Sequence, residues 1–85
     1  MASLKKVFAS LLGGRSDANT RFAELRRILL ALRFSERVTG GHHIFSRQDV
    51  TEILNLQPLP GGKAKAYQVK QVRQVITKYR LPLPE

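Results

Sequence analysis

Hydrophobic positions in the first dozen residues recur at the spacing of one face of an α-helix. Residues 3–12 predict a short amphipathic helix, with Ser3 as its N-cap and Gly13 and Gly14 ending it. The apolar face of this helix carries Leu4, Val7, Phe8, Leu11 and Leu12. A helix this short is marginal in water by itself, so we expect it to pack on the domain or on a partner, or to fray. Two lysines and the absence of Trp argue against the alternative that it binds a membrane surface.

A second helical pattern follows a polar linker at residues 13–19. From about residue 20 to 33 the apolar side chains fall at spacings of three, four and three, which predicts one buried helix face. That face carries Phe22, Leu25, Leu29 and Leu32, and Ile28 widens it. The basic residues of this stretch fall mostly elsewhere, and we expect them to be solvated. They are Arg21, Arg26, Arg27 and Arg33.

Alternation replaces helical spacing in the middle of the chain. The pattern predicts three short strands, at residues 34–38, 42–47 and 52–57. The first turn is Thr39-Gly40-Gly41, and the second lies at about residues 46–49. Leu54 and Leu56 share one face of the third strand, and Asn55 and Gln57 share the other. Three successive short strands joined by turns predict an antiparallel meander.

After a loop rich in Pro and Gly, residues 58–65, helical spacing returns at residues 67–80. One stripe of this last helix is apolar, with Val69, Val72, Ile76 and Tyr79. The stripe one position along is mostly basic, with Lys70, Arg73, Thr77 and Arg80. The whole pattern predicts an α+β domain in which two helices cover one face of a three-stranded antiparallel sheet and leave the other face open. We expect an N-terminal extension at residues 1–19, a domain at residues 20–81 and a tail at residues 82–85.

The amino-acid composition limits which classes of protein this chain can belong to. The chain has 85 residues, of which 42% are hydrophobic, so one small globular domain is expected. No cysteine is present, which excludes a disulfide scaffold and a Cys-based zinc site. No apolar run approaches the ~20 residues of a membrane span, and no secretory signal is evident, so the expected location is the cytoplasm. The formal net charge of +9 predicts attraction to a polyanion, with nucleic acid as the first candidate.

Candidate chemistry is concentrated in Gly40-Gly41-His42-His43-Ile44-Phe45, which contains both histidines of the chain. Histidine titrates near neutral pH and is the usual general acid or base there. Adjacent strand residues point to opposite faces, so His43 should share the core face with Phe45 while His42 faces outward. A bulge at Gly41 would reverse this assignment. We expect His43 to make a structural hydrogen bond and His42 to be the candidate for chemistry.

The sequence lacks the residues that a metal-dependent nuclease or a P-loop protein would need. The six acidic residues are scattered, and Gly61-Gly62-Lys63 lacks the spacing of a P-loop and the Ser or Thr that follows it. The two histidines should point to opposite faces of one strand, so they cannot bind the same metal ion. A lone histidine in a basic setting suits cleavage of RNA without a metal or cofactor, because the 2′-hydroxyl is an internal nucleophile.

The order of these motifs resembles the HicA family of bacterial toxins across about residues 20–81. The matching features are Gly40, Gly41, His42 and Phe45, the helix before them and the basic segment of residues 63–80 after them. The resemblance implies a fold like that of double-stranded-RNA-binding domains, an mRNA-cleaving endoribonuclease activity, a HicB antitoxin as partner, and a catalytic role for His42. Gly41 stands where the family often has Ser or Thr, and residues 1–19 are extra relative to the family pattern.

Three hypotheses follow. The first is a toxin of a type II toxin–antitoxin system that cleaves single-stranded or messenger RNA with His42 as general acid or base. Its expected RNA contacts are Gly41, Lys63, Lys65, Lys70 and Arg73, although a solvated helix face would also explain each cation. The second is a non-catalytic RNA-binding module on the same fold. The third is a protein-interaction domain, with residues 3–12 as a possible membrane contact.

Overall fold

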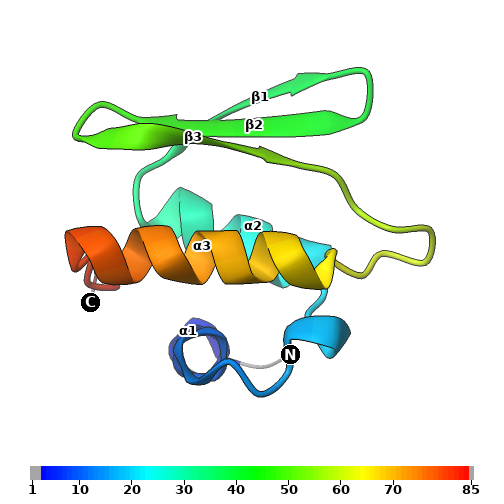
Figure 1. The fold of residues 1–85 in the computed structure, drawn as a ribbon, viewed down its shortest axis with the longest axis horizontal. Helices are drawn as coiled ribbons and strands as arrows, with labels where there is room; N and C mark the ends of the chain where they lie inside the picture. The colour runs from blue at the N-terminus through cyan, green and yellow to red at the C-terminus, as the bar shows by residue number, and fades with distance from the viewer. Residues whose placement is uncertain (1–2, 85) are drawn as a thin grey trace.

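Three layers stack in the structure of the protein, a computed structural model that describes residues 3–84 (Figure 1). The first layer is a sheet of β1 (Ser35–Thr39), β2 (His42–Arg47) and β3 (Val50–Leu56). The second layer is formed by α2 (Phe22–Ala31) and α3 (Ala66–Tyr79). The third contains α1 (Leu4–Gly13) and a short 3-10 helix, η1 (Asp17–Asn19). The predicted α+β class, with two helices on one face of the sheet, is confirmed.

The sheet is an antiparallel meander in the order β1-β2-β3, as predicted. Gly40 and Gly41 form the first turn with φ values of +54° and +83°, and a two-residue hairpin turn with two positive φ angles matches the twist of its strands. Phe45 pairs with Glu36 on one side and with Leu54 on the other. The ladder shifts register between Phe45 and Arg47, so β3 begins at Val50 rather than at the predicted residue 52.

The core lies between the sheet and the two middle helices. All five residues of the predicted α2 face are buried, as are the predicted core residues Phe45, Leu54 and Leu56 of the sheet. On α3 the buried residues Val69, Val72 and Ile76 confirm the apolar stripe, and Tyr79 is half-buried against the same core. Within residues 3–84 no helix lies over the opposite face of the sheet, so the predicted open face is confirmed (Figure 1).

The N-terminal helix packs on the domain, which settles the three alternatives left by the sequence. Ser3 caps it as predicted, because the Ser3 hydroxyl oxygen accepts a hydrogen bond from the Lys6 N–H at 3.2 Å. Leu11 is buried, and the other apolar side chains of the face pack against the core, except Leu12. Leu12 remains 43% exposed, so its assignment to the packed face was wrong. Leu12 lies about 100° around the helix axis from Leu11, and this rotation turns it toward solvent.

The predicted linker contains a structural contact. Asp17, at the start of η1, receives hydrogen bonds from Arg73 of α3 at 2.8 and 3.0 Å. Arg73 also donates to the backbone oxygen of Leu11 at 3.3 Å. These bonds tie α1 and η1 to α3. Residues 1, 2 and 85, at the ends of the expected extension and tail, lie outside the described residues.

Across residues 3–84, no helix combines the length and apolar character needed to cross a membrane.

Candidate active site at the hairpin end of the sheet

The two histidines lie on opposite faces of β2, as the alternation of the strand predicts. The ring of His43 points toward α2, where its centroid lies 4.7 Å from that of Phe22. Its Nδ1 is 2.8 Å from a carboxylate oxygen of Glu36, which confirms the expected structural hydrogen bond. His42 is exposed on the open face, directly after the Gly40-Gly41 turn.

His42 is oriented by a neighbour on the next strand. Its Nδ1 lies 3.0 Å from Oδ1 of Asn55, which pairs in register with Ile44 and projects from the same face. With the amide oxygen as acceptor, Nδ1 carries the proton and the lone pair of the neutral ring resides on Nε2. Within the part of the chain that the structure describes, Nε2 makes no hydrogen bond. The ring is therefore held with one nitrogen open to a ligand from solvent.

Asn55 was not among the residues singled out in the sequence. The predicted third strand already placed Asn55 on its outward face, opposite the leucines. Its partnership with His42 depends on the register between β2 and β3, and the alternation of the two strands did not predict the irregularity of this ladder between Phe45 and Arg47.

His43 belongs to a cluster with a structural role. Glu36 accepts hydrogen bonds from Arg26 Nε at 2.9 Å as well as contacting His43, and its side chain is 10% exposed. The bond from Arg26 is the main cause that lowers the pKa of the Glu36 carboxyl, and His43 adds to it against the opposing effect of burial. This cluster joins α2, β1 and β2. Arg26, which we expected to be simply solvated, is half-exposed and paired.

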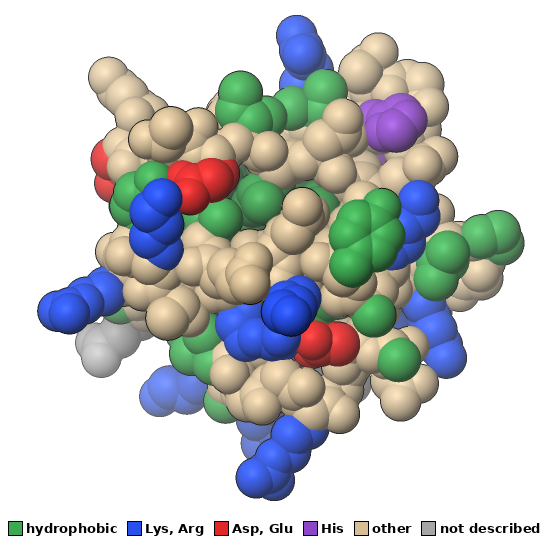
Figure 2. All heavy atoms as spheres, in the orientation of Figure 1, with side chains coloured by type: hydrophobic (Ala, Val, Ile, Leu, Met, Phe, Trp, Pro, Cys, Tyr) green, Lys and Arg blue, Asp and Glu red, His purple; other side chains and the backbone are tan. Residues whose placement is uncertain are grey.

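Two of the predicted RNA-contacting residues lie at the same end of the sheet as His42. Lys65 Nζ is 3.5 Å from Oε1 of Gln57, the residue that follows β3. Gly41 borders the same amide, because a Cβ added there would come 3.9 Å from Gln57 Nε2. Figure 1 shows the hairpin turn and the start of α3 at one end of the molecule. Figure 2 shows a histidine, basic side chains and exposed hydrophobic side chains at that end.

Lys63 is near this end but makes a different contact. Its Nζ lies 3.4 Å from Oδ1 of Asn19, and its backbone pairs with that of Arg21 in an isolated bridge. A Cβ at Gly62 would come 3.7 Å from a guanidinium nitrogen of Arg21. The loop before α3 therefore gathers three cations, Arg21, Lys63 and Lys65, of which the sequence argument missed Arg21.

The other two predicted contacts lie on a different side. Arg73 faces α1 and η1, where Asp17 and the Leu11 oxygen occupy its guanidinium. Lys70 is exposed one helical turn before Arg73, so it projects from the same side of α3. The structure thus brings Gly41, His42 and Lys65 together, places Lys63 beside them, and separates Lys70 and Arg73 from them.

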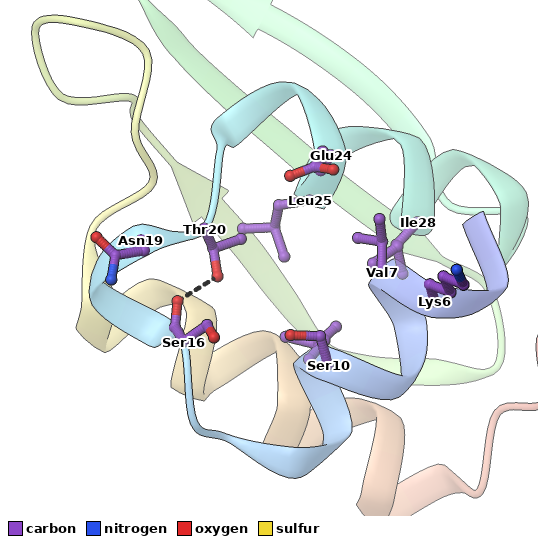
Figure 3. A pocket seen from close by; sticks show the side chains of 10 residues that line it. Lys6, Val7, Ser10, Ser16, Asn19, Thr20, Glu24, Leu25 and Ile28 are labelled. Carbon is purple, nitrogen blue, oxygen red and sulfur yellow. Dashed lines mark hydrogen bonds between the residues drawn. The ribbon is translucent and has the colours of Figure 1, made fainter. Parts of the chain in front are cut away.

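The surface of the described residues is hollowed on both sides of the helical layer. One hollow, of about 290 Å³, lies between α1, η1 and α2, away from the sheet (Figure 3). It has an apolar floor that includes Val7 and Ile28, and Thr20 on its rim donates a hydrogen bond to the Ser16 backbone oxygen at 2.9 Å. The other, of about 500 Å³, runs between β3 and α3 and includes Asn55 in its lining. The second hollow therefore adjoins the orienting partner of His42.

The acidic and histidine side chains remain dispersed. Among residues 3–84, no three of them come close enough together to share a metal ion.

Comparison with known proteins returned no match to a family model, to a curated protein or to a solved structure.

Proposed function

We propose that this protein is a metal-independent endoribonuclease with His42 as its general base. The observation that carries the proposal is the His42–Asn55 pair, which holds an exposed imidazole in one orientation on the open face of a strongly basic domain. Single-stranded RNA is the substrate, because its unpaired nucleotides can rotate freely enough to bring a 2′-hydroxyl into line with the adjacent phosphate.

The chemistry follows from the tautomer that Asn55 selects. Nε2 of neutral His42 takes the proton from the 2′-hydroxyl, and the resulting oxygen attacks the adjacent phosphorus. The bond from phosphorus to the 5′-oxygen breaks, which leaves a 2′,3′-cyclic phosphate on one product and a 5′-hydroxyl on the other. Water supplies the proton that the leaving oxygen takes up. Lys65, at the same end of the sheet, stabilises the negative charge that develops on the phosphate oxygens.

The order of elements supports the proposed cellular role. From α2 to α3 the chain runs helix, three antiparallel strands, helix, with both helices on one face, which is the arrangement expected of a double-stranded-RNA-binding-domain-like fold. With the Gly-Gly-His-His-x-Phe segment, this order supports a HicA-like toxin that cleaves messenger RNA in the cytoplasm and is inhibited by a HicB-type antitoxin.

Cleavage of a labelled single-stranded RNA in excess EDTA tests the proposal. The wild type is expected to cut the RNA and to leave a 2′,3′-cyclic phosphate, and His42→Ala is expected to bind the RNA without cutting it. Cleavage that EDTA abolishes, or that His42→Ala retains, would contradict the proposed mechanism.

A second candidate function is a non-catalytic RNA-binding module. One observation favours it: the partner of His42 is a neutral amide, and within residues 3–84 no carboxylate contacts this ring to support proton transfer. The same experiment separates the two functions. A folded wild type that binds RNA and never cuts it would leave the binding module as the function.

A further inference from the structure

The hollow between β3 and α3 begins beside the proposed catalytic pair. Asn55, which orients His42, lines it together with Ile53 of β3 and with Gln71 and Gln74 of α3. Ile53 is 67% exposed, and both glutamines are exposed. Within the described chain, neither glutamine side chain makes a hydrogen bond. The groove therefore offers apolar surface and free amides next to the site, and its charged lining residues, Glu52 and Lys78, are paired with each other at 2.8 Å.

Tyr67 lies on α3 one helical turn before Gln71, just beyond the residues that line the groove. It precedes Gln71 by four residues and Gln74 by seven, so the three side chains follow one another along the same side of α3. Its side chain is 61% exposed, in a chain where most aromatic residues are in the core. Figure 2 shows an exposed hydrophobic side chain at this end of α3, beside a basic one.

The side chain of Gln68 connects Tyr67 to the end of β3 through hydrogen bonds. The buried amide of Gln68 accepts a hydrogen bond from the backbone N–H of Gln57 at 3.1 Å and donates to the backbone oxygen of Asn55 at 3.3 Å. Its Nε2 also donates to the hydroxyl of Tyr67 at 3.4 Å. The first turn of α3 is thereby fixed to the end of β3 that carries Asn55, and the Gln68 amide bridges the Tyr67 hydroxyl and the backbone oxygen of Asn55.

We propose that this groove holds the RNA strand that flanks the cleaved bond, with Tyr67 stacking on one of its bases. The inference rests on the proposed function and extends it to substrate binding. Stacking on exposed aromatic rings is how proteins hold single-stranded RNA with little dependence on sequence. Gln71 and Gln74 have donors and acceptors for base edges. The strand therefore leaves the site on the β3 side of α3, away from Lys70 and Arg73.

The test compares two ligands with equal phosphate charge: a 2′-O-methylated ten-nucleotide oligouridine and a ten-unit 2′-O-methylated ribose phosphate that lacks every base. Neither ligand can be cut through a 2′-hydroxyl, so binding is measured whether or not the protein is a nuclease. The wild type is expected to bind the oligouridine about tenfold more tightly. Tyr67→Leu should lose most of this preference, and Tyr67→Phe should keep it.

Two controls keep the test specific. Val38→Ala removes an exposed apolar side chain from the opposite edge of the sheet and should leave the preference unchanged. Leu12→Ala removes an exposed apolar side chain from α1, in the layer farthest from the sheet, and should also keep it. If the wild type binds both ligands equally, or if Tyr67→Leu retains the wild-type preference, the proposal is overturned. The cleavage experiment in EDTA is unaffected by either result and decides the proposed function separately.

Discussion

His42 and His43 are neighbours in the chain, yet they lie in two different chemical environments. His43 contacts a phenyl ring and a carboxylate on the core side of the sheet, and its side chain is 21% exposed. His42 projects from the face that no helix covers, with a neutral amide as its partner. The difference shows how one strand can carry a structural residue and a candidate catalytic residue at adjacent positions, because the pleat sends them to opposite faces.

The comparison also shows what each partner does. Glu36 holds a charge next to His43 and shares it with Arg26, so that cluster is suited to joining elements. Asn55 holds no charge, so it orients His42 and leaves its second nitrogen available. The predictions below test this division of roles.

The largest difference is expected in the rate of RNA cleavage. His42→Ala should lower kcat by about 10²- to 10⁴-fold, the range that a positioned acid or base supplies. His43→Gln should change kcat by less than about tenfold, because its ring does not reach the open face. Single-turnover cleavage at matched RNA concentrations measures both. A greater loss in His43→Gln, with the fold intact by circular dichroism, would reverse the assignment of the two histidines.

The second-largest effect on the cleavage rate is expected from changes at Asn55, which orients His42. Asn55→Leu should lower kcat about ten- to a hundredfold while leaving KM nearly unchanged, since misplacing a reacting group has costs of this order. Asn55→Asp keeps an acceptor for Nδ1 and adds a negative charge that favours the imidazolium. The acid limb of the pH–rate profile should therefore move to higher pH in Asn55→Asp. An unchanged profile would indicate that Asn55 is merely structural.

Changes in the Glu36 cluster should lower the stability of the fold rather than the rate of RNA cleavage. Glu36→Gln is expected to lower the free energy of unfolding by about 1–2 kcal/mol near neutral pH, because hydrogen bonds to a charged group are weakened. The folded-state pKa of Glu36 is lowered from 4.5, so its contribution is present above that pH and is lost as the pH falls through the folded value.

Urea unfolding at pH 6 and pH 3 measures this contribution. The wild type should lose more stability between the two pH values than Glu36→Gln does. Glu52, whose pKa is lowered to about 2 mainly by hydrogen bonds from Lys78 and Tyr79, contributes acid dependence equally to both proteins. If both proteins lose the same unfolding free energy between these pH values, Glu36 does not contribute to stability against acid.

The smallest effects distinguish two cations. Lys65→Gln should reduce the slope of log K against log salt for single-stranded RNA by about 0.7, the contribution of one phosphate contact. Arg73→Gln should leave that slope unchanged and lower the unfolding midpoint instead, because it breaks the bonds to Asp17. Fluorescence anisotropy at several salt concentrations provides the measurement. A reduced slope in Arg73→Gln would place RNA on the α1 side of α3.

Local pattern was sufficient for the elements of this protein. Apolar spacing located the three α-helices, strand alternation located the sheet, and the Gly40-Gly41 pair located the hairpin turn. Each of these features depends on residues a few positions apart, where backbone geometry and side-chain type act directly. The same alternation placed His42 outside and His43 inside, because no bulge interrupts the strand at Gly41.

Contacts between distant residues were decided by the tertiary structure. The partnership of His42 with Asn55 depends on the register of two strands, and that of Arg73 with Asp17 depends on the docking of the N-terminal segment against α3. The basic stripe of α3 could be read from the sequence, but the side that it faces could not. Whether this stripe faces the proposed RNA site or the N-terminal segment depends on which sides of α3 the sheet and α1 cover. Only the packing of the whole chain determines this.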